Sequence, residues 1–275
     1  MGFAMFATLK IFSLQIISKV QFLCHSEVMK QNLVFQILNI IDSSNNYAMD
    51  VIHEGLAKPG TAYFALAQTN GKGQRNKNWH SQPGENILLS VVIQPQQEFQ
   101  RFPFLFNAAV ALICRQFLAQ ITSAKVNIKW PNDLYINDRK AGGILIENIF
   151  RGKNWNWSVI GIGINVNQTG FPDDLSNPIS IKQITGKKHL PEELARQLHQ
   201  NIVDFFENTS EIDAFEIMNA YNECLYKAGK MVTLKKNEAV FETKIVKVDR
   251  DGYLITADSE ERKFSFGEVE WVVAP

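Results

Sequence analysis

Three clusters of polar and charged residues in this chain could do chemistry, and the first is a loop at residues 68–79. It carries Lys72, Arg75 and Lys77, two glycines and no apolar residue before Trp79. Backbone N–H groups and basic side chains of this kind can fold over phosphates. The Gly-x-x-x-x-Gly-Lys-Ser/Thr spacing of a Walker loop is absent, so a solvated loop is the alternative to a phosphate-binding one.

The second cluster lies at residues 129–147, which read as a hairpin. Pro131 ends the preceding strand because it has no N–H to donate, and Asn137-Asp138 tolerates the positive φ of a two-residue turn. Lys140 follows the turn, and the Gly142-Gly143 pair would let a ligand lie directly on the backbone. A lysine beside bare backbone suits an anionic small molecule, and a plain hairpin with a solvated lysine is the alternative.

The third cluster combines a helix start with a glycine-containing strand. Ser43, Ser44 and Asn45 are typical helix N-cap residues, and the same groups could hydrogen-bond a polar ligand. Glycines within the segment Gly161-Ile162-Gly163-Ile164-Asn165 also suggest close approach of a ligand, which Asn165 could contact.

The elements that would position these clusters follow from hydrophobic patterning. Strands are predicted at Leu33–Ile41, Thr61–Ala67, Asn86–Ile93, Val126–Trp130 and Trp155–Val166, and helices at Tyr47–Ala57, Phe102–Ile121, Pro191–Glu207 and Glu211–Lys227. This interleaving predicts an α/β fold with a mixed sheet and helices packed on it. After Gly229, short strands with polar turns predict a small β-barrel. The predicted domains are 29–228 and 229–275, preceded by an apolar leader at 1–28 that need not belong to the fold.

Composition narrows the function classes. The chain has 275 residues, with 28 Lys+Arg and 28 Asp+Glu, so its formal net charge gives no general reason to bind nucleic acid or an anionic membrane. Three widely spaced cysteines and scattered histidines argue against a disulfide framework and a structural metal site. Lys10 and Lys19 interrupt the leader, so no run there reaches transmembrane length. A cytoplasmic protein is expected, as a monomer or homodimer.

Taken together, these residues resemble the biotin–protein ligases, also called biotin–[acetyl-CoA-carboxylase] ligases, from about Leu33 to Val273. The matching motifs, in the order of the family, are the loop from Gly71 to Trp79, the segment from Lys129 through Asp133 and Lys140 to Gly143, and Gly161 to Asn165. The resemblance implies the class II synthetase-like catalytic fold of biotin and lipoate ligases, with an SH3-like C-terminal barrel.

The resemblance also implies a two-step reaction. Biotin and ATP with Mg²⁺ would give biotinyl-5′-AMP and pyrophosphate, and a lysine of a biotin carboxyl carrier protein, from acetyl-CoA carboxylase or another biotin-dependent carboxylase, would then attack. The implied catalytic residues are Lys140, Arg75 and Lys72. Biotin-binding residues would be Ser43, Ser44, Asn45, Gln68, Lys72, Gly73, Gln74, Lys140, Gly143 and Leu145. ATP or adenylate would contact Gly71, Arg75, Lys77, Trp79, Lys129, Asn132 and Asn165, and Asp133 would associate with Mg²⁺.

The chain departs from the family pattern in its loop, which commonly reads Gly-Arg-Gly-Arg-Arg-Gly-Arg. Lys72, Gln74, Asn76 and Lys77 replace four of those residues, so bidentate phosphate contacts are fewer and adenylate retention is in question. With 28 residues before the fold, no DNA-binding repressor domain is expected. Two rival functions share these features: a lipoyl or octanoyl ligase or transferase of the same fold, and a non-catalytic biotin-responsive regulator or scaffold.

Overall fold

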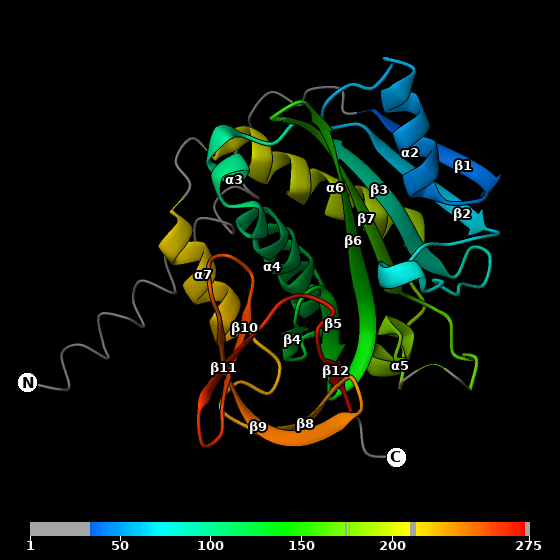
Figure 1. Ribbon diagram of the computed structural model, residues 1–275. Coiled ribbons are helices and arrows are strands. Elements are labelled where there is room, and N and C mark those ends of the chain that lie inside the picture. Colours follow the sequence, from blue (N-terminus) through cyan, green and yellow to red (C-terminus); the bar gives the residue numbers. More distant parts are fainter. Residues whose placement is uncertain (1–33, 174, 176, 210–212, 273–275) are drawn as a thin grey trace, which may run out of the picture.

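The computed structural model describes residues 34–173, 175, 177–209 and 213–272 (Figure 1). The predicted leader and Leu33, the predicted start of the first strand, lie outside these residues. Strands and helices interleave along the chain and form two sheets, with helices packed on the larger one. The mixed α/β class predicted from the sequence is therefore confirmed.

The larger sheet has seven strands. In spatial order they are β1 (Phe35–Ile41), β2 (Ala62–Gln68), β3 (Asn86–Ile93), β7 (Asn154–Asn165), β6 (Arg139–Arg151), β5 (Asp133–Ile136) and β4 (Val126–Lys129). β1 and β2 are parallel and are connected through α2 (Ser44–His53), because a parallel pair needs a crossover. The following neighbours are antiparallel.

The hairpin between β5 and β6 carries the second cluster. Asn137 and Asp138 have φ values of 49° and 62°, as a tight two-residue turn requires, so the predicted turn is confirmed. β6 pairs with β5 as far as Gly143 and then continues alone on that side to Arg151. It stays extended because β7 pairs with it from Gly142 to Arg151.

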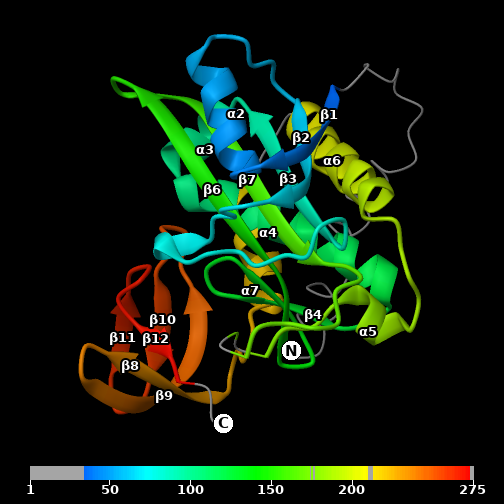
Figure 2. The ribbon, with the colours of Figure 1, turned by 90° about the vertical axis from the view of Figure 1, so that its right-hand side faces the viewer.

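The two faces of the sheet bury different side chains, because successive residues of a strand point to opposite sides. Phe64 and Leu89 belong to the main core, under α4 (Pro103–Thr122), α6 (Pro191–Asn208) and α7 (Ala214–Glu223). Tyr63 and Val92 belong to a smaller core under α2. Figures 1 and 2 show α2 on one face and α4 and α6 on the other.

Within the described residues, α4 is the one helix long and apolar enough to cross a membrane by length and composition. It packs against α6, α7 and the sheet, and Phe106, Cys114 and Phe117 on it are buried. A helix that is apolar all round is typical of such a core position.

Helix boundaries differ from the predictions in ways that matter for the site. α2 begins at Ser44 rather than Tyr47, so the polar residues expected before the helix form its first turn. α7 begins at Ala214, after the capping residue Asp213; the predicted start at residue 211 lies outside the described part of the chain. The one-turn helices α3 (Gln97–Arg101) and α5 (Ile181–Thr185) were not predicted, because they are too short to show helical periodicity.

The C-terminal strands form a second sheet at one end of the first (Figure 2). In spatial order they are β11 (Glu261–Phe264), β10 (Leu254–Ala257), β9 (Ala239–Val248), β8 (Met231–Lys236) and β12 (Glu270–Trp271). Up to residue 272 the two outer strands do not pair, so the sheet is open and closure into a barrel is not confirmed. The indole Nε1 of Trp130 donates to the carbonyl of Gly252, which ties this sheet to the end of β4.

Candidate active site

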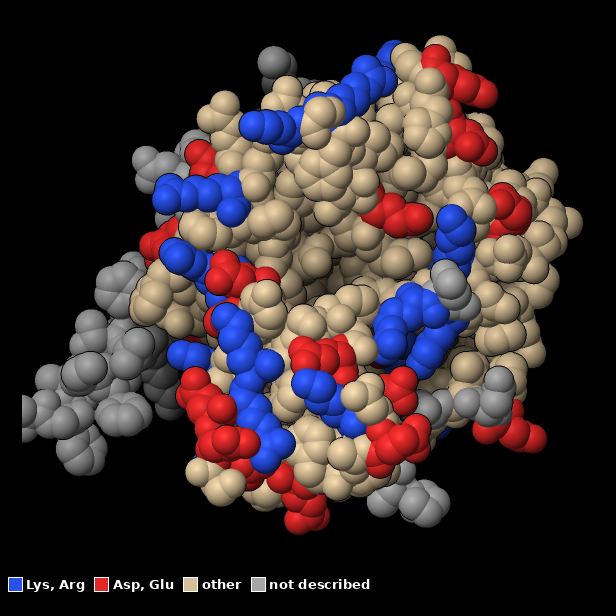
Figure 3. Space-filling view, viewed as in Figure 1, with Lys and Arg blue, Asp and Glu red and all other residues tan. Residues whose placement is uncertain are grey.

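A cleft of about 710 Å³ opens on the α2 face of the large sheet. Its walls are the first turn of α2, the loop after β2, strands β5 to β7 and the segment 266–271 of the second sheet. Figure 3 shows the hollow, with Lys and Arg side chains along one side. All three clusters singled out in the sequence therefore meet at one place.

Glycines form the floor of this cleft. Gly143 on β6 lies opposite Gly163 on β7, and the indole ring of Trp79 covers both. A Cβ atom built on Gly163 would lie 2.7 Å from Cζ2 of Trp79 and 2.9 Å from Cδ2, closer than carbon atoms can approach. The indole Nε1 of Trp79 is buried and has no hydrogen-bond partner among the described residues. The ring thus lies flat on bare backbone with its polar group unused.

Polar side chains close one end of the cleft. The hydroxyl of Ser90 lies 2.8 Å from the Ser44 hydroxyl and donates to Oδ1 of Asn45 at 2.6 Å. Gln68 caps α2, because its Oε1 accepts from the N–H of Ser44 at 2.7 Å. The side-chain amide of Asn45 donates to Glu147 at 2.7 Å. Ser44, Asn45 and Ser90 are buried, and the network holds these hydroxyls and amides in fixed positions.

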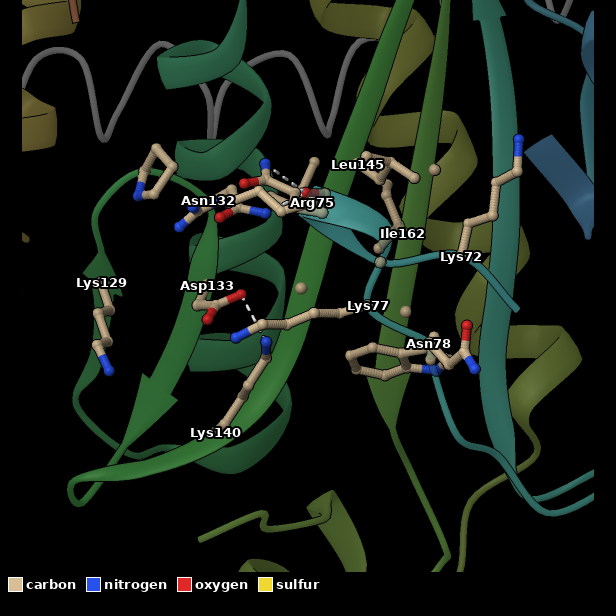
Figure 4. A pocket seen from close by; sticks show the side chains of 18 of the residues that line it. Lys72, Arg75, Lys77, Asn78, Lys129, Asn132, Asp133, Lys140, Leu145 and Ile162 are labelled. Carbon is tan, nitrogen blue, oxygen red and sulfur yellow. Dashed lines mark hydrogen bonds and ion pairs between the residues drawn. The ribbon is translucent and has the colours of Figure 1, made fainter. Parts of the chain in front are cut away.

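Two lysines and an aspartate lie at the other end (Figure 4). Nζ of Lys140 pairs with Oδ1 of Asp133 at 2.7 Å, and Lys129 contacts the Tyr135 hydroxyl at 3.2 Å and the ring of Trp271. Burial lowers the pKa of Lys129 to about 8; the Asp133 carboxylate opposes this shift, and the charges of Lys140 and Lys77 add to it. These cations face the same space, where an anion would be attracted.

The backbone at Lys140 is fixed from the opposite side. Its N–H donates to the carbonyl of Asn177 at 3.0 Å, and its carbonyl accepts from the N–H of Ile179 at 2.9 Å. The side-chain amide of Asn165 donates to the carbonyls of Lys140 and Ile179. Asn165 therefore locks two segments together in this structure and sets the direction in which the lysine leaves the strand.

The basic loop folds back on itself. Lys72 and Asn78 form a β-bridge, the N–H of Gly73 donates to the carbonyl of Lys77 at 2.7 Å, and a short 3-10 turn (Gln74–Asn76) makes the tip. Arg75, at φ 56°, has a left-handed conformation.

Two of the loop cations contact carboxylates at the rim of the cleft. Lys72 lies 3.7 Å from Glu147, and Arg75 lies 3.9 Å from Glu270 of the second sheet.

A metal site is not preformed in the described part of the chain, where no group of three His, Cys, Asp or Glu side chains could hold an ion. Asp133 and Glu270 are the carboxylates that line the cleft. One carboxylate beside cations suits Mg²⁺ that arrives with a nucleotide, since this ion keeps its waters and takes phosphate oxygens.

Comparison with known proteins finds one matching family model. Residues 37–165, just under half of the chain, match the model of the Biotin/lipoate A/B protein ligase family.

The chain is also similar to known proteins. The chain is 37% identical to the "Bifunctional ligase/repressor BirA" of Bacillus spizizenii over 175 residues, which are 62% of this chain and 52% of that protein. It is 34% identical to the "Biotin--[acetyl-CoA-carboxylase] ligase" of Paracoccus denitrificans over 160 residues, which are 55% of this chain and 64% of that protein. The chain thus spans about half the length of the first relative.

The fold agrees with a solved structure over most of the chain. The biotin protein ligase from Aquifex aeolicus in complex with biotin and ATP superimposes with a TM-score of 0.71 and covers 88% of this chain and 99% of that one. At 24% identity this likeness shows the fold.

The fold brings the site residues predicted from the sequence together, with one exception. The residues that line the cleft are Ser43, Ser44, Asn45, Gln68, Lys72, Gly73, Gln74, Arg75, Lys77, Trp79, Lys129, Asn132, Asp133, Lys140, Gly143, Leu145 and Asn165. Gly71 does not line it. The carbonyl of Gly71 accepts from the N–H of Trp79 at 2.8 Å, so this glycine closes the base of the loop.

Among the residues of the site that sequence reasoning missed, five contribute clearly to its geometry: Ser90, Glu147, Gly267, Glu270 and Trp271. Ser90 could have been found, because a serine in a strand of eight buried residues needs a partner. Glu147 carries no such signal, since it follows an apolar run at an ordinary strand position. The C-terminal residues Gly267, Glu270 and Trp271 reach the cleft because the second sheet packs beside it. The local sequence around these residues does not predict that packing.

Proposed function

We propose that this protein is an ATP-dependent biotin–protein ligase, which forms biotinyl-5′-AMP and transfers biotin to a lysine of a biotin carboxyl carrier protein. The observation that carries the proposal is the arrangement of one cleft. It has a closed polar end and a glycine floor under Trp79, and it is also lined by Lys140 and by the cations of the loop.

The polar end suits the ureido ring of biotin. That ring offers two N–H donors and one carbonyl acceptor, and Ser44, Ser90 and Gln68 supply hydroxyl and amide groups there. Asn45 would act mainly by holding this set in place, because its amide already donates to Glu147 and its oxygen accepts from Ser90. A lipoyl or octanoyl chain has no N–H or carbonyl group to offer these hydroxyl and amide groups, which favours biotin over the rival substrates.

The cationic half of the cleft suits the adenylation step, in which one anion attacks another. Lys140 would hold the biotin carboxylate against the α-phosphorus, and Lys72, Arg75, Lys77 and Lys129 would neutralise the phosphates. Mg²⁺ would arrive as part of the ATP complex, with Asp133 as its protein carboxylate.

Trp79 and the loop would change partners as ATP binds. The ring now lies on the floor that an adenine would need, so we infer that it lifts and stacks on the base. Gly73 and Gln74 would follow with the loop and exclude water from the mixed anhydride.

The working unit would consist of a catalytic domain, residues 29–228, and an SH3-like C-terminal domain, residues 229–275. The second sheet supplies Gly267, Glu270 and Trp271 to the rim of the cleft, which favours a role in closing it. Cys114 and Cys224 are free thiols, and a reducing cytoplasm suits them. We propose action without nucleic acid or membrane, as a monomer or homodimer.

Pyrophosphate release tests this function. The protein is incubated with ATP and Mg²⁺, biotin, lipoate or octanoate is added in turn, and transfer to an apo carrier domain follows. Release and transfer that depend on biotin are expected. Activity with lipoate or octanoate alone would move the function to lipoylation, and silence with all three would favour a non-catalytic regulator.

A further inference from the structure

A second cavity of about 360 Å³ lies beside the cleft and has no role in the function proposed above. It is bounded by the start of α4, by the edge of β6 that continues past β5, and by the turn between β9 and β10. Five residues line both cavities, so the two share a wall: Gln74, Pro131, Asn132, Ile144 and Phe266.

Side-chain amides make up much of this wall. Nε2 of Gln74 donates to the carbonyl of Ile144 at 3.4 Å, and Nδ2 of Asn132 donates to the same carbonyl. The backbone N–H of Ile144 in turn donates to the backbone carbonyl of Asn132 at 3.1 Å. The long bond of Gln74 is a weak one, so rotation of that side chain would connect the cavities without a backbone change.

The charges of the two cavities are opposite in sign. The cleft is lined by five cations, Lys72, Arg75, Lys77, Lys129 and Lys140, against the carboxylates of Asp133 and Glu270. Among the residues that line the second cavity, the one charged side chain is Asp251, which is exposed at its mouth. A cationic group would be repelled at the cleft and attracted at the second cavity.

We propose that this second cavity is the entrance for the acceptor lysine of the carrier protein. Asp251 receives the lysine ammonium at the mouth, and Gln74 and Asn132 form a gate through which the side chain reaches the acyl group. This inference rests on the function proposed above and concerns its second step.

The route also suits the chemistry of transfer. The ammonium first loses one proton to water at the cavity mouth, and the neutral amine then attacks the biotinyl carbonyl carbon. A C–N bond forms, the C–O bond to the phosphate breaks, and AMP leaves with that electron pair on its phosphate oxygen. The second proton of the nitrogen passes to solvent. Entry from this side needs only the Gln74 side chain to rotate and leaves the loop backbone over the phosphates in place.

Adenylation and transfer can be assayed separately, and this distinguishes a failure of the entrance proposal from a failure of the ligase function. Hydroxylamine is a small neutral nucleophile, so biotin hydroxamate formation reports adenylation without the carrier. Transfer to an apo biotin carboxyl carrier domain reports the complete path. The variants are Asp251→Asn, which removes the charge, and Asn107→Trp. Asn107 lines the second cavity from the start of α4, so a tryptophan there would fill it. Glu238→Gln is the matched control, a carboxylate to amide change at a fully exposed turn of the same sheet.

D251N should raise the KM for the carrier about three- to fivefold, near the upper limit for one exposed charge pair. N107W should lower transfer at least as strongly. Hydroxamate formation by D251N should stay within twofold, and E238Q should match the unsubstituted protein in both assays. Because Asp251 is exposed, D251N decides the matter even where N107W does not fold.

A carrier KM within twofold of normal in D251N, with hydroxamate formed, overturns the entrance and leaves the ligase function standing. Absence of hydroxamate and pyrophosphate from the unsubstituted protein overturns the ligase function, and the entrance with it.

Discussion

Gly163→Ala tests the assignment of the glycine floor, because it adds one methyl group at a defined place. Gly163 has no positive φ, so its backbone conformation accepts alanine. The surrounding space is too small, however, because the new Cβ would lie 2.7 Å and 2.9 Å from two ring atoms of Trp79. A ring cannot yield at its far end as a flexible chain does, so the whole indole must lift or the strand must shift.

The size of the effect follows from overpacking. Forcing one methyl group into a filled site usually costs about 1–3 kcal/mol. If an adenine takes the floor position when ATP binds, the same methyl group meets the base instead, and the penalty falls on ATP binding. We expect the KM for ATP to rise by about 5- to 150-fold, since each 1.4 kcal/mol is a factor of ten.

A matched variant lies two residues earlier on the same strand. In Gly161→Ala the new Cβ meets Asn45 instead, 2.8 Å from its Cγ and Nδ2 atoms. It should therefore raise the KM for biotin and leave that for ATP within about threefold.

Pyrophosphate release at varied ATP and at varied biotin measures both variants. The reasoning fails if G163A changes neither constant, or if both variants change the same one. W79A should also weaken ATP more than biotin, and an effect confined to biotin would disprove the adenine assignment.

Three further predictions concern charged groups. Lys140→Ala should lower adenylate formation by about 10²–10³, as loss of a donor to developing charge does, and pyrophosphate release within threefold of normal would contradict this. Because the pKa of Lys129 is lowered to about 8, its cation is present below that pH and lost above it, so kcat/KM for ATP should fall as pH passes about 8. In Lys129→Arg, kcat/KM for ATP should fall less above pH 8, because the guanidinium group stays charged. An equal decrease in the variant and the unsubstituted protein would exclude Lys129 as its cause. Glu147→Ala should raise the KM for biotin several-fold by freeing Asn45 and Lys72, whereas Glu147→Gln keeps an acceptor for Asn45 and should be milder. Equal effects of the two Glu147 variants would leave only the pairing with Lys72 as the cause.

Local chemistry made much of the fold predictable. The strand at Asn86–Ile93 was found with its correct ends because Asn86 and seven apolar or small residues are bounded by polar turns. The turn at Asn137-Asp138 was found because few residue types accept two positive φ angles in succession. In both cases the signal lies within the segment that it determines.

The start of α2 was harder, because Ser44 and Asn45 favour caps as strongly as first-turn positions. Gln68 decides between them by capping the N–H of Ser44 from a different strand. The contribution of Glu270 and Trp271 to the cleft could not be predicted either, because it too depends on contacts between distant parts of the chain. It depends on how one sheet packs on another, and the contact between Trp130 and Gly252 that fixes this packing joins residues far apart in the chain.

The cations of the cleft differ in how firmly the protein holds them, and this difference orders the steps of binding. Lys140 and Asp133 are paired at 2.7 Å with side chains 31% and 26% exposed, whereas Arg75 and Glu270 are 3.9 Å apart and 48% and 68% exposed. Exposed pairs contribute little to stability, so phosphates can replace Glu270 as the partner of Arg75 at almost no cost. Lys140 and the half-buried Lys129 stay in place because neighbouring groups position them whether or not ligand is bound. The fixed lysines therefore define where the reacting anions bind. The loop cations contact the phosphates only after that. A chain with no net charge can in this way hold five cations in one cleft.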